Sequence, residues 1–248
     1  MSNKINGLGL FLRKLLKSSG RLLAETEMKI YLQATHCFMA EGADDKTLRV
    51  QLQMLGIDGR RLTRFSQLIL LGALPLADKL QGQTAIFCGS PFNSPRKFDK
   101  MFENLMQHNL PSPLDFMANL NNAATFQLAQ ALQTHGNAIF LALNRQSYWQ
   151  PLALAILELL DNDCEQALVG WGLESITENT TEREGAVFWL LGTSPIPALA
   201  EVEFITEDAS EMPAGDFLAP SMAMLEQLKR EAVLLPLSDG RAIRLASV

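Results

Sequence analysis

Two kinds of apolar pattern alternate along the chain. Short, nearly continuous apolar runs are typical of strands that are covered on both faces. Longer stretches, in which apolar residues recur every three or four positions, are typical of amphipathic helices. This alternation predicts a layered α/β domain. The predicted strands are residues 4–9, 84–88, 138–144, 166–172, 186–191, 202–206 and 242–246.

The predicted helices are residues 44–55, 60–79, 94–108, 115–134, 150–160 and 221–235. Ser94 and Pro95 form an N-cap followed by proline at the first helical position. Pro75 should kink or end the second helix. The acidic stretch 203–220, which contains glycine and proline, predicts a surface connection. We therefore expect one domain over residues 1–196 and a small C-terminal appendage, 197–248, packed on it.

Composition narrows the classes of function. A chain of 248 residues with 48% hydrophobic side chains can bury a sizeable core. Its 21 basic and 27 acidic residues give a net charge of −6, which argues against the basic face that nucleic-acid binding requires. Cys37, Cys88 and Cys164 have neither disulfide nor zinc spacing, so we expect a reducing, cytoplasmic compartment and no metal or other cofactor.

No apolar run is long enough to predict a membrane span. The basic, amphipathic segment 11–17 has two interpretations. It contacts an anionic partner or lipid, or it is a solvated helix face.

Candidate nucleophiles lack an obvious base. The three histidines, His36, His108 and His135, all lie in the first 135 residues, and a cysteine or serine nucleophile would have to use one of them. Cys88 is at a strand end where a nucleophile could be presented, but the favoured interpretation is a buried structural thiol, because free cysteine behaves mainly as a small hydrophobic residue. Ser90 does not lie in a G-x-S-x-G motif, and no phosphate-binding or metalloprotease motif occurs. The residues alone therefore predict an α/β scaffold without a catalytic constellation.

One region resembles a known family. Residues 136–147 read Gly-Asn-Ala-Ile-Phe-Leu-Ala-Leu-Asn-Arg-Gln-Ser, a helix follows, and the next strand closes with Gly170-Trp171-Gly172. This resembles the nucleophile region of β-ketoacyl (acyl carrier protein) synthases, where a strand ends in Thr-Ala-Cys-Ser and the strand after the helix closes with a Gly-Gly segment. Aligning Gly172 with the second glycine of that segment places Gln146 at the position of the cysteine without a gap.

Further segments resemble the family in the same order: 60–66, 87–90, 112–116 with Asn121 and Asn122, and 183–186, whose Glu-Gly-Ala matches part of a Gly-Glu-Gly-Ala turn. The resemblance covers most of residues 4–192 but only the N-terminal half of a full synthase. It implies a thiolase-like layered α/β half-fold with a mixed β-sheet flanked by helices.

Two departures from the family affect the expected function. Gln146 replaces the thiol that carries the acyl chain, and a primary amide cannot form a thioester. No histidine follows His135, whereas a synthase takes two histidines and a lysine from its C-terminal half. Glutamine at this position resembles chain-length factors, which are inactive paralogues of the synthases. The half-length form resembles the aryl-polyene type, which implies a heterodimer with a catalytic β-ketoacyl synthase and transient contact with acyl carrier protein.

The resemblance also implies site residues. In synthase dimers the strand before the nucleophile pairs across the two-fold axis, which predicts an interface at Ala138, Phe140, Ala142 and Asn144. Tyr148 and Trp149 belong either to that interface or to the core. Phe116, Met117 and Leu120 are either a gate that limits the length of the acyl chain in the partner's pocket or plain core residues.

Three roles are open for Gln146: a hydrogen-bonding plug at the subunit boundary, a mimic of a thioester carbonyl that supports malonyl decarboxylation, or an ordinary loop residue. Two other functions compete with the chain-length factor. One is a stand-alone acyl hydrolase or acyltransferase that uses Ser90 or Cys88. The other is an adaptor that binds carrier protein without contacting the acyl pocket.

Overall fold

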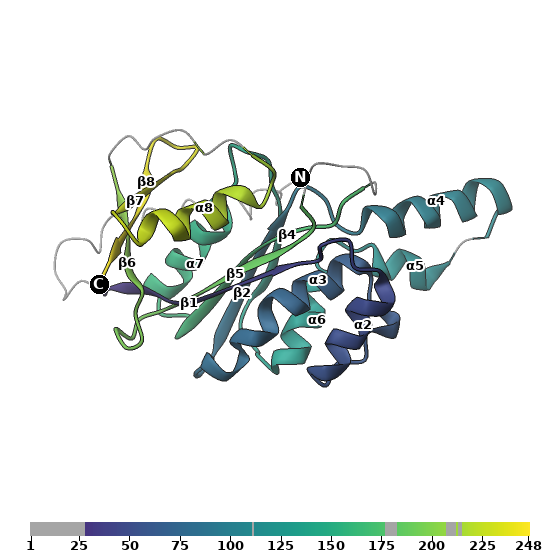
Figure 1. The fold of residues 1–248 in the computed structure, drawn as a ribbon, viewed down its shortest axis with the longest axis horizontal. Coiled ribbons are helices and arrows are strands. Elements are labelled where there is room, and N and C mark those ends of the chain that lie inside the picture. The colour runs from purple at the N-terminus through teal and green to yellow at the C-terminus, as the bar shows by residue number, and fades with distance from the viewer. Residues whose placement is uncertain (1–27, 111, 177–182, 207–211, 213–214) are drawn as a thin grey trace, which may run out of the picture.

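One mixed sheet of eight strands organises the chain (Figure 1). The computed structural model describes residues 28–110, 112–176, 183–206, 212 and 215–248. The strand order is β3-β2-β4-β5-β1-β6-β8-β7. The strands are β1 (Ile30–Met39), β2 (Thr84–Ser90), β3 (Ala138–Ala142), β4 (Gln166–Leu173), β5 (Gly185–Gly192), β6 (Ala200–Ile205), β7 (Val233–Pro236) and β8 (Ala242–Ser247). The layered α/β fold is confirmed, while the predicted strand 4–9 and the basic segment 11–17 lie outside the described residues.

Strands β1, β2, β3 and β4 run in the same direction. Strand β2 pairs in parallel with β3 and with β4. Strand β5 is antiparallel to both β4 and β1, so β1 has the direction of β2, β3 and β4. The C-terminal ends of these four strands therefore lie at one end of the sheet, which we call the carboxyl end.

Helices cover both faces of the sheet (Figure 1). One face packs against α2 (Asp45–Met54), α3 (Arg64–Ala73) and α6 (Ala123–Leu132), and the other against α7 (Gln150–Leu160) and α8 (Ala219–Leu228). Every residue of β4 and β5 is buried, as expected of strands with both faces covered. Short 3-10 helices occur at Gly59–Arg61 and Leu74–Lys79. The second of these begins where Pro75 ends α3, as predicted.

Aromatic side chains fill the core beneath α7 and α8. Tyr148 stacks on Trp171 with ring centroids 5.6 Å apart, and Trp149 lies 5.8 Å from Trp189. The indole N–H of Trp171 donates to the carbonyl oxygen of Tyr148 at 2.8 Å. The hydroxyl of Tyr148 in turn donates to Oγ of Ser221 at 3.0 Å. These contacts join the start of α7, the central strands and the start of α8.

The C-terminal appendage continues the same sheet and the same core. Strand β6 pairs with β1, and β8 and β7 follow it outward. Leu218, Met224 and Leu228, in and beside α8, belong to the hydrophobic cluster that contains the tryptophans. The appendage thus extends the sheet and covers one of its faces, while the boundary at residues 196 and 197 stays a prediction.

The structure differs from the sequence prediction at β1 and in the predicted helices 115–134 and 221–235. No strand was predicted at β1, because Gln33, Thr35 and His36 interrupt its apolar pattern. The predicted helix 115–134 is two helices, α5 (Pro113–Ala118) and α6, separated by a turn in which the Asn119 side chain donates to the Asp115 carbonyl.

The predicted helix 221–235 is wrong in its second half. Helix α8 ends at Leu228, and the apolar run that follows forms β7 through pairing with β8. Periodicity alone does not separate a short buried strand from the last turns of a helix.

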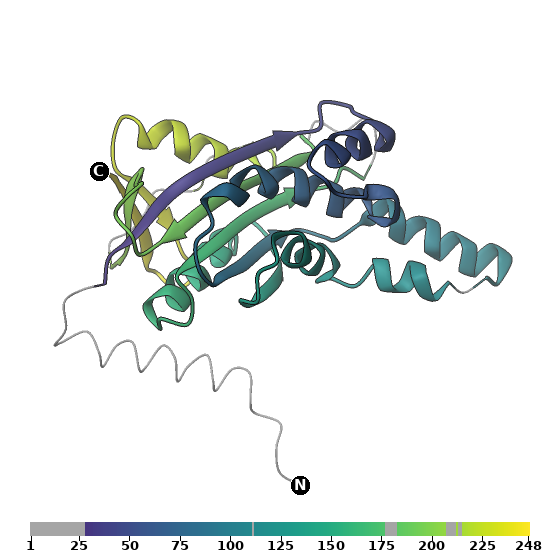
Figure 2. The same cartoon turned by 90° about the horizontal axis from the view of Figure 1, so that it is seen from below.

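A two-helix arm projects from the body (Figures 1 and 2). It consists of α4 (Pro95–His108) and α5, which we call the arm. No residue of α4 is buried. Lys97 of α4 forms an ion pair with Asp115 of α5 at 2.5 Å, so the two helices hold each other.

The Tyr148 hydroxyl gives the first test. Tyr148→Phe removes the hydrogen bond to Ser221 and should lower the free energy of unfolding by about 1 kcal/mol, measured by urea denaturation. Tyr31→Phe is the matched control, because the Tyr31 hydroxyl makes no hydrogen bond to any described residue, and it should change stability far less. Equal losses in the two variants would contradict this account of the core.

Candidate functional site

Strand β3 leaves one side of its backbone unpaired. It is the first strand of the sheet, and its one partner among the described strands is β2. The carbonyl of Asn137 accepts from the Ile86 N–H at 2.7 Å, and the Leu143 N–H donates to the Ser90 carbonyl at 2.9 Å. Because backbone groups alternate along a strand, the N–H and C=O groups of Ala138, Phe140 and Ala142 point toward the free edge. These are the strand residues that the sequence predicted at a subunit interface.

Apolar side chains surround this edge. Ile139 on β3 and Phe126 on α6 are exposed, whereas Phe140 packs edge-to-face on Phe65 with centroids 6.0 Å apart. The arm exposes a further set of large apolar residues: Phe98, Phe102, Leu105, Met106, Leu114, Phe116 and Met117, with Leu110 and Leu120 at its ends. Apolar exposure on this scale marks an interaction surface.

The predicted gate residues belong to this exposed set. Phe116 and Met117 are 63% and 61% exposed on α5, and Leu120 is 44% exposed in the turn that follows it. They are therefore not core residues of this chain, and the core interpretation of these three residues fails.

Gln146 lies in a tight turn between β3 and α7. The Asn144 side-chain oxygen accepts from the Ser147 N–H, and the Asn144 N–H donates to Oγ of Ser147, both at 2.9 Å. These reciprocal bonds fix the turn. The side chains of Asn144 and Gln146 are exposed. Tyr148 and Trp149, which follow Ser147, are buried in the aromatic core of their own chain. This is the core alternative that the sequence analysis left open for these two residues.

A cavity of about 290 Å³ lies between this turn and the appendage. Leu143, Arg145 and Tyr148 line one side, and Asp216 and Phe217 line the other. None of the described residues that line it is a histidine, cysteine or serine. The described lining of the cavity therefore provides a carboxylate and a phenol but no serine or cysteine nucleophile.

The candidate nucleophiles of the sequence lie in the core. Cys88 is fully buried, and burial raises the pKa of its thiol to about 12. Ser90 is also buried, and its hydroxyl donates to the Phe92 carbonyl at 2.7 Å. His36 is held near the Gly72 carbonyl, with 2.9 Å between Nδ1 and the oxygen. No serine or cysteine triad is formed by these groups, so the geometry gives no support to the hydrolase alternative.

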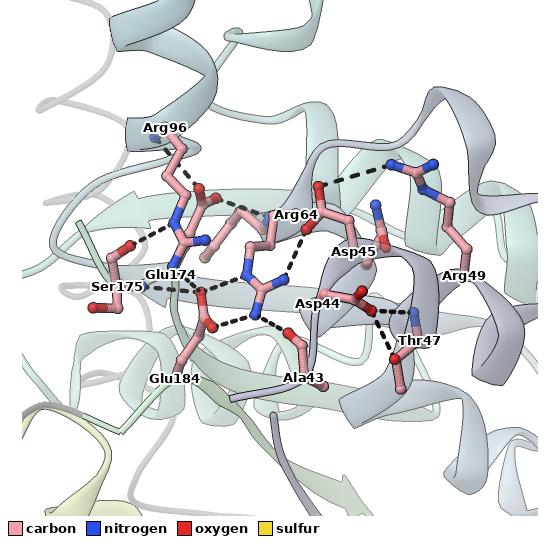
Figure 3. Close-up of polar contacts among 12 residues, drawn as sticks. Ala43, Asp44, Asp45, Thr47, Arg49, Arg64, Arg96, Glu174, Ser175 and Glu184 are labelled. Carbon is pink, nitrogen blue, oxygen red and sulfur yellow. Dashed lines mark hydrogen bonds and ion pairs between the residues drawn. The ribbon is translucent and has the colours of Figure 1, made fainter. Parts of the chain in front are cut away.

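A charged cluster lies at the carboxyl end (Figure 3). Arg64, at the start of α3, pairs with Glu184 at 2.5 Å and with Asp45 at 2.7 Å, and it also donates to the Ala43 carbonyl at 2.6 Å. The hydrogen bonds that Arg64 donates to Glu184 raise the pKa of Arg64 above its ordinary value. The cluster joins the segment after β1, the first turn of α3 and the residue before β5.

Glu174 is the buried acid of this cluster. It follows β4 directly, is 1% exposed, and accepts from the backbone N–H of Phe65 at 3.0 Å and of Arg96 at 3.4 Å. Burial raises the pKa of Glu174 to about 7, although the N–H and guanidinium of Arg96 oppose the rise. This role could not be predicted from the sequence, because both donors come from distant parts of the chain.

No metal site emerges from the described part of the chain. Within it, no three histidine, cysteine, aspartate or glutamate side chains come together to hold a metal ion. The helices described there are all too short or too polar to cross a membrane.

Comparison with known proteins identifies the fold. No protein-family model and no curated protein sequence matches the chain. Among solved structures, it is similar to a chain in the complex of the ketosynthase ApeO with its chain length factor ApeC from Xenorhabdus doucetiae. The TM-score is 0.62 and the identity is 16%, and the match covers 89% of this chain and 100% of that one. This chain has a ketosynthase-like, thiolase-type fold.

Two further ketosynthase assemblies are similar. The AntDE:AntF complex, in which a type II polyketide synthase carrier protein is bound to its ketosynthase, matches with TM-score 0.57 and 14% identity over 82% of this chain and 74% of that one. The ishigamide ketosynthase/chain length factor matches with TM-score 0.55 and 14% identity over 82% and 73%. The similarity extends to the mixed sheet and its flanking helices, which agrees with the half-fold that the resemblance implied.

Titration of Glu174 gives the second test. The pKa is about 7 in the folded chain and about 4.5 ordinarily, so between these values the folded state keeps a proton that the unfolded state has released. This part of the stability therefore falls as pH rises from 4.5 to 7 and is constant above 7. Glu174→Gln cannot titrate, so the difference in unfolding free energy between wild type and variant should change by about 2–3 kcal/mol across that window. A difference that is constant from pH 4.5 to 8 would contradict the assignment.

Proposed function

We propose that this chain is a non-catalytic chain-length-factor subunit that pairs with a catalytic β-ketoacyl synthase and shapes its acyl pocket. The observation that carries the proposal is the free edge of β3, where Ala138, Phe140 and Ala142 present unpaired backbone groups beside exposed apolar side chains. An edge of this kind is a template for another strand, and it risks aggregation when left uncovered. The similar solved structures are themselves ketosynthase assemblies, which supports a synthase as the partner.

The partner would complete the sheet. A strand of the synthase adds to β3 through the outward N–H and C=O groups, and Ile139 and Phe126 are covered in the same step. Main-chain hydrogen bonds and apolar burial then act together, as in other cases of strand addition. The Xenorhabdus chain is matched over its whole length, which supports a half-length subunit of this type.

The condensation chemistry belongs to the partner. Gln146 has no acidic proton and no thiol, and no histidine follows His135 in the sequence. Gln146 is exposed in the turn that follows β3. This exposure supports an amide at the proposed boundary that donates and accepts hydrogen bonds. We assign it as a plug at that boundary and not as a decarboxylase group, because decarboxylation would need histidines that this chain does not supply.

The arm supplies the gate. Phe116 and Met117 extend from a helix that is held by the Lys97–Asp115 ion pair, and the Leu120 carbonyl accepts from the Asn93 side chain at 2.8 Å. An acyl chain that grows into these side chains must displace them, and overpacking by a few methylenes costs about 1–3 kcal/mol. The products belong to polyketide or aryl polyene biosynthesis, in which acyl carrier protein delivers the chains and contacts the complex transiently.

The edge of β3 can be blocked without disturbing its own sheet. Ala142→Pro removes an N–H that points away from β2, so the fold should persist while affinity for the synthase falls at least about tenfold. The matched control, Ala142→Ser, keeps the N–H and should bind like wild type. Affinity for the partner synthase is measured by isothermal titration calorimetry, and folding of each variant is checked by near-ultraviolet circular dichroism. Equal affinity of a folded Ala142→Pro variant would contradict pairing at this edge.

If Phe116 and Met117 form the gate, shortening their side chains should change the length of the products. Phe116→Ala and Met117→Ala enlarge the space at the end of the pocket, so the reconstituted complex should make products longer by one or more two-carbon units, measured by mass spectrometry. Leu114→Ala is the control, because Leu114 lies on the same helix and is 78% exposed but is not part of the gate. Unchanged lengths for both gate variants, or the same shift for the control, would exclude a gate at these residues.

A further inference from the structure

One buried carboxylate connects the arm to the body. Glu174 accepts from the Phe65 N–H in the first turn of α3 and from the Arg96 N–H in the first turn of α4. Two helices that leave the carboxyl end in different directions (Figure 1) therefore share a single acceptor. Each N–H has its own carboxyl oxygen: Oε2 accepts from Phe65 and Oε1 from Arg96.

The two helices differ in how firmly they are held. Every residue of α3 is buried, so α3 is a fixed reference within the body. No residue of α4 is buried, so packing in the core does not fix its direction. Its position depends on contacts at its first turn. Besides the bond to Glu174, these include the Ser94 hydroxyl, which donates to Oγ1 of Thr63 at 2.8 Å. Nε of Arg96 donates to the Ser175 carbonyl at 3.0 Å, and the Arg96 guanidinium lies 3.6 Å from the Glu184 carboxylate.

The direction of α4 is passed on to α5. Lys97 is one residue after Arg96, and it holds Asp115 directly before Phe116 and Met117. Further along, the Asn119 amide lies 3.6 Å from the sulfur of Met101. A rotation of α4 about its first turn therefore carries α5 and its exposed apolar side chains with it.

We propose that Glu174 is a positioning residue that sets the direction of the arm and, through it, where Phe116 and Met117 meet the acyl chain in the partner's pocket. The gate role of those two residues rests on the proposed function, whereas the direction of the arm does not. Among the residues that the structure describes, Glu174 is the one side chain that bonds the backbone of both α3 and α4. The charged groups near Glu174 are Arg96 from α4, Arg64 from α3 and Glu184, which precedes β5. Glu174 therefore belongs to a cluster of ionisable side chains at the start of the arm.

The test uses two variants and a matched control. Glu174→Gln keeps the size of the side chain but replaces one acceptor by an N–H₂ group that faces N–H donors. Glu174→Asp keeps the charge and draws the carboxylate away from them. The control is Glu158→Gln, a second buried glutamate, which accepts from the Asn137 side chain at the opposite end of the sheet.

Arm direction is measured by electron–electron double resonance between nitroxide labels at Gln107→Cys on α4 and Lys46→Cys on α2, in a Cys37→Ser background, with the chain alone and in its complex with the synthase. We expect both Glu174 variants to shift or broaden the distance distribution relative to wild type and the control. We also expect their complexes to make products that differ by at least one two-carbon unit, or a wider range of lengths, with affinity for the synthase within about threefold of wild type.

The outcomes separate the two proposals. Wild-type distances in Glu174→Gln and Glu174→Asp would overturn the positioning role, and so would an equal shift in Glu158→Gln. If one Glu174 variant fails to fold, the other decides the question. A shifted arm with unchanged product lengths would also overturn the inference as stated. A wild-type chain that neither binds the synthase nor alters its product lengths would instead refute the proposed function, and the label distances in the chain alone would still test Glu174.

Discussion

The parallel pairing of β2 with both β3 and β4 determines where the arm, the Gln146 turn and Glu174 lie. Because these strands share a direction, the segments that follow them begin at the same end of the sheet. The arm follows β2, the Gln146 turn follows β3, and Glu174 follows β4. Residues that are far apart in sequence thus meet at the carboxyl end, as is general for binding sites in sheets of this kind. An antiparallel β3 would separate the turn from the arm.

The two edge strands of the sheet, β7 and β3, differ in how open they are to further strand pairing. At one edge, the appendage adds three strands and ends in β7, which is short and closes with Pro236. Short edge strands and proline discourage further pairing. At the other edge, β3 has outward backbone groups, exposed Ile139 and a neighbouring arm that is rich in exposed apolar residues. The contrast within one sheet favours a specific partner at β3.

The sequence predicted the centre of the molecule better than its periphery. Strands β2, β4 and β5 were found because both of their faces are buried, which makes each a continuous apolar run. Strand β3 was also predicted from its apolar run. The alignment of Gln146 with the cysteine of the synthases rests on the family resemblance and stays a prediction. The exposure of Phe116 and Met117 could not be predicted, because the spacing of apolar residues is the same in an exposed amphipathic helix as in a core helix. Glu174 was missed because its donors, Phe65 and Arg96, are brought to it by the fold alone.

The most direct test of the central claim is amide hydrogen exchange along β3, with and without the synthase. Pairing at the free edge predicts that the amides of Ala138, Phe140 and Ala142 become at least about tenfold more protected in the complex. The amides of Ile139 and Leu141, which already face β2, should change less. Equal exchange of the three outward amides in the free and the bound chain would contradict the claim that this edge receives the partner's strand.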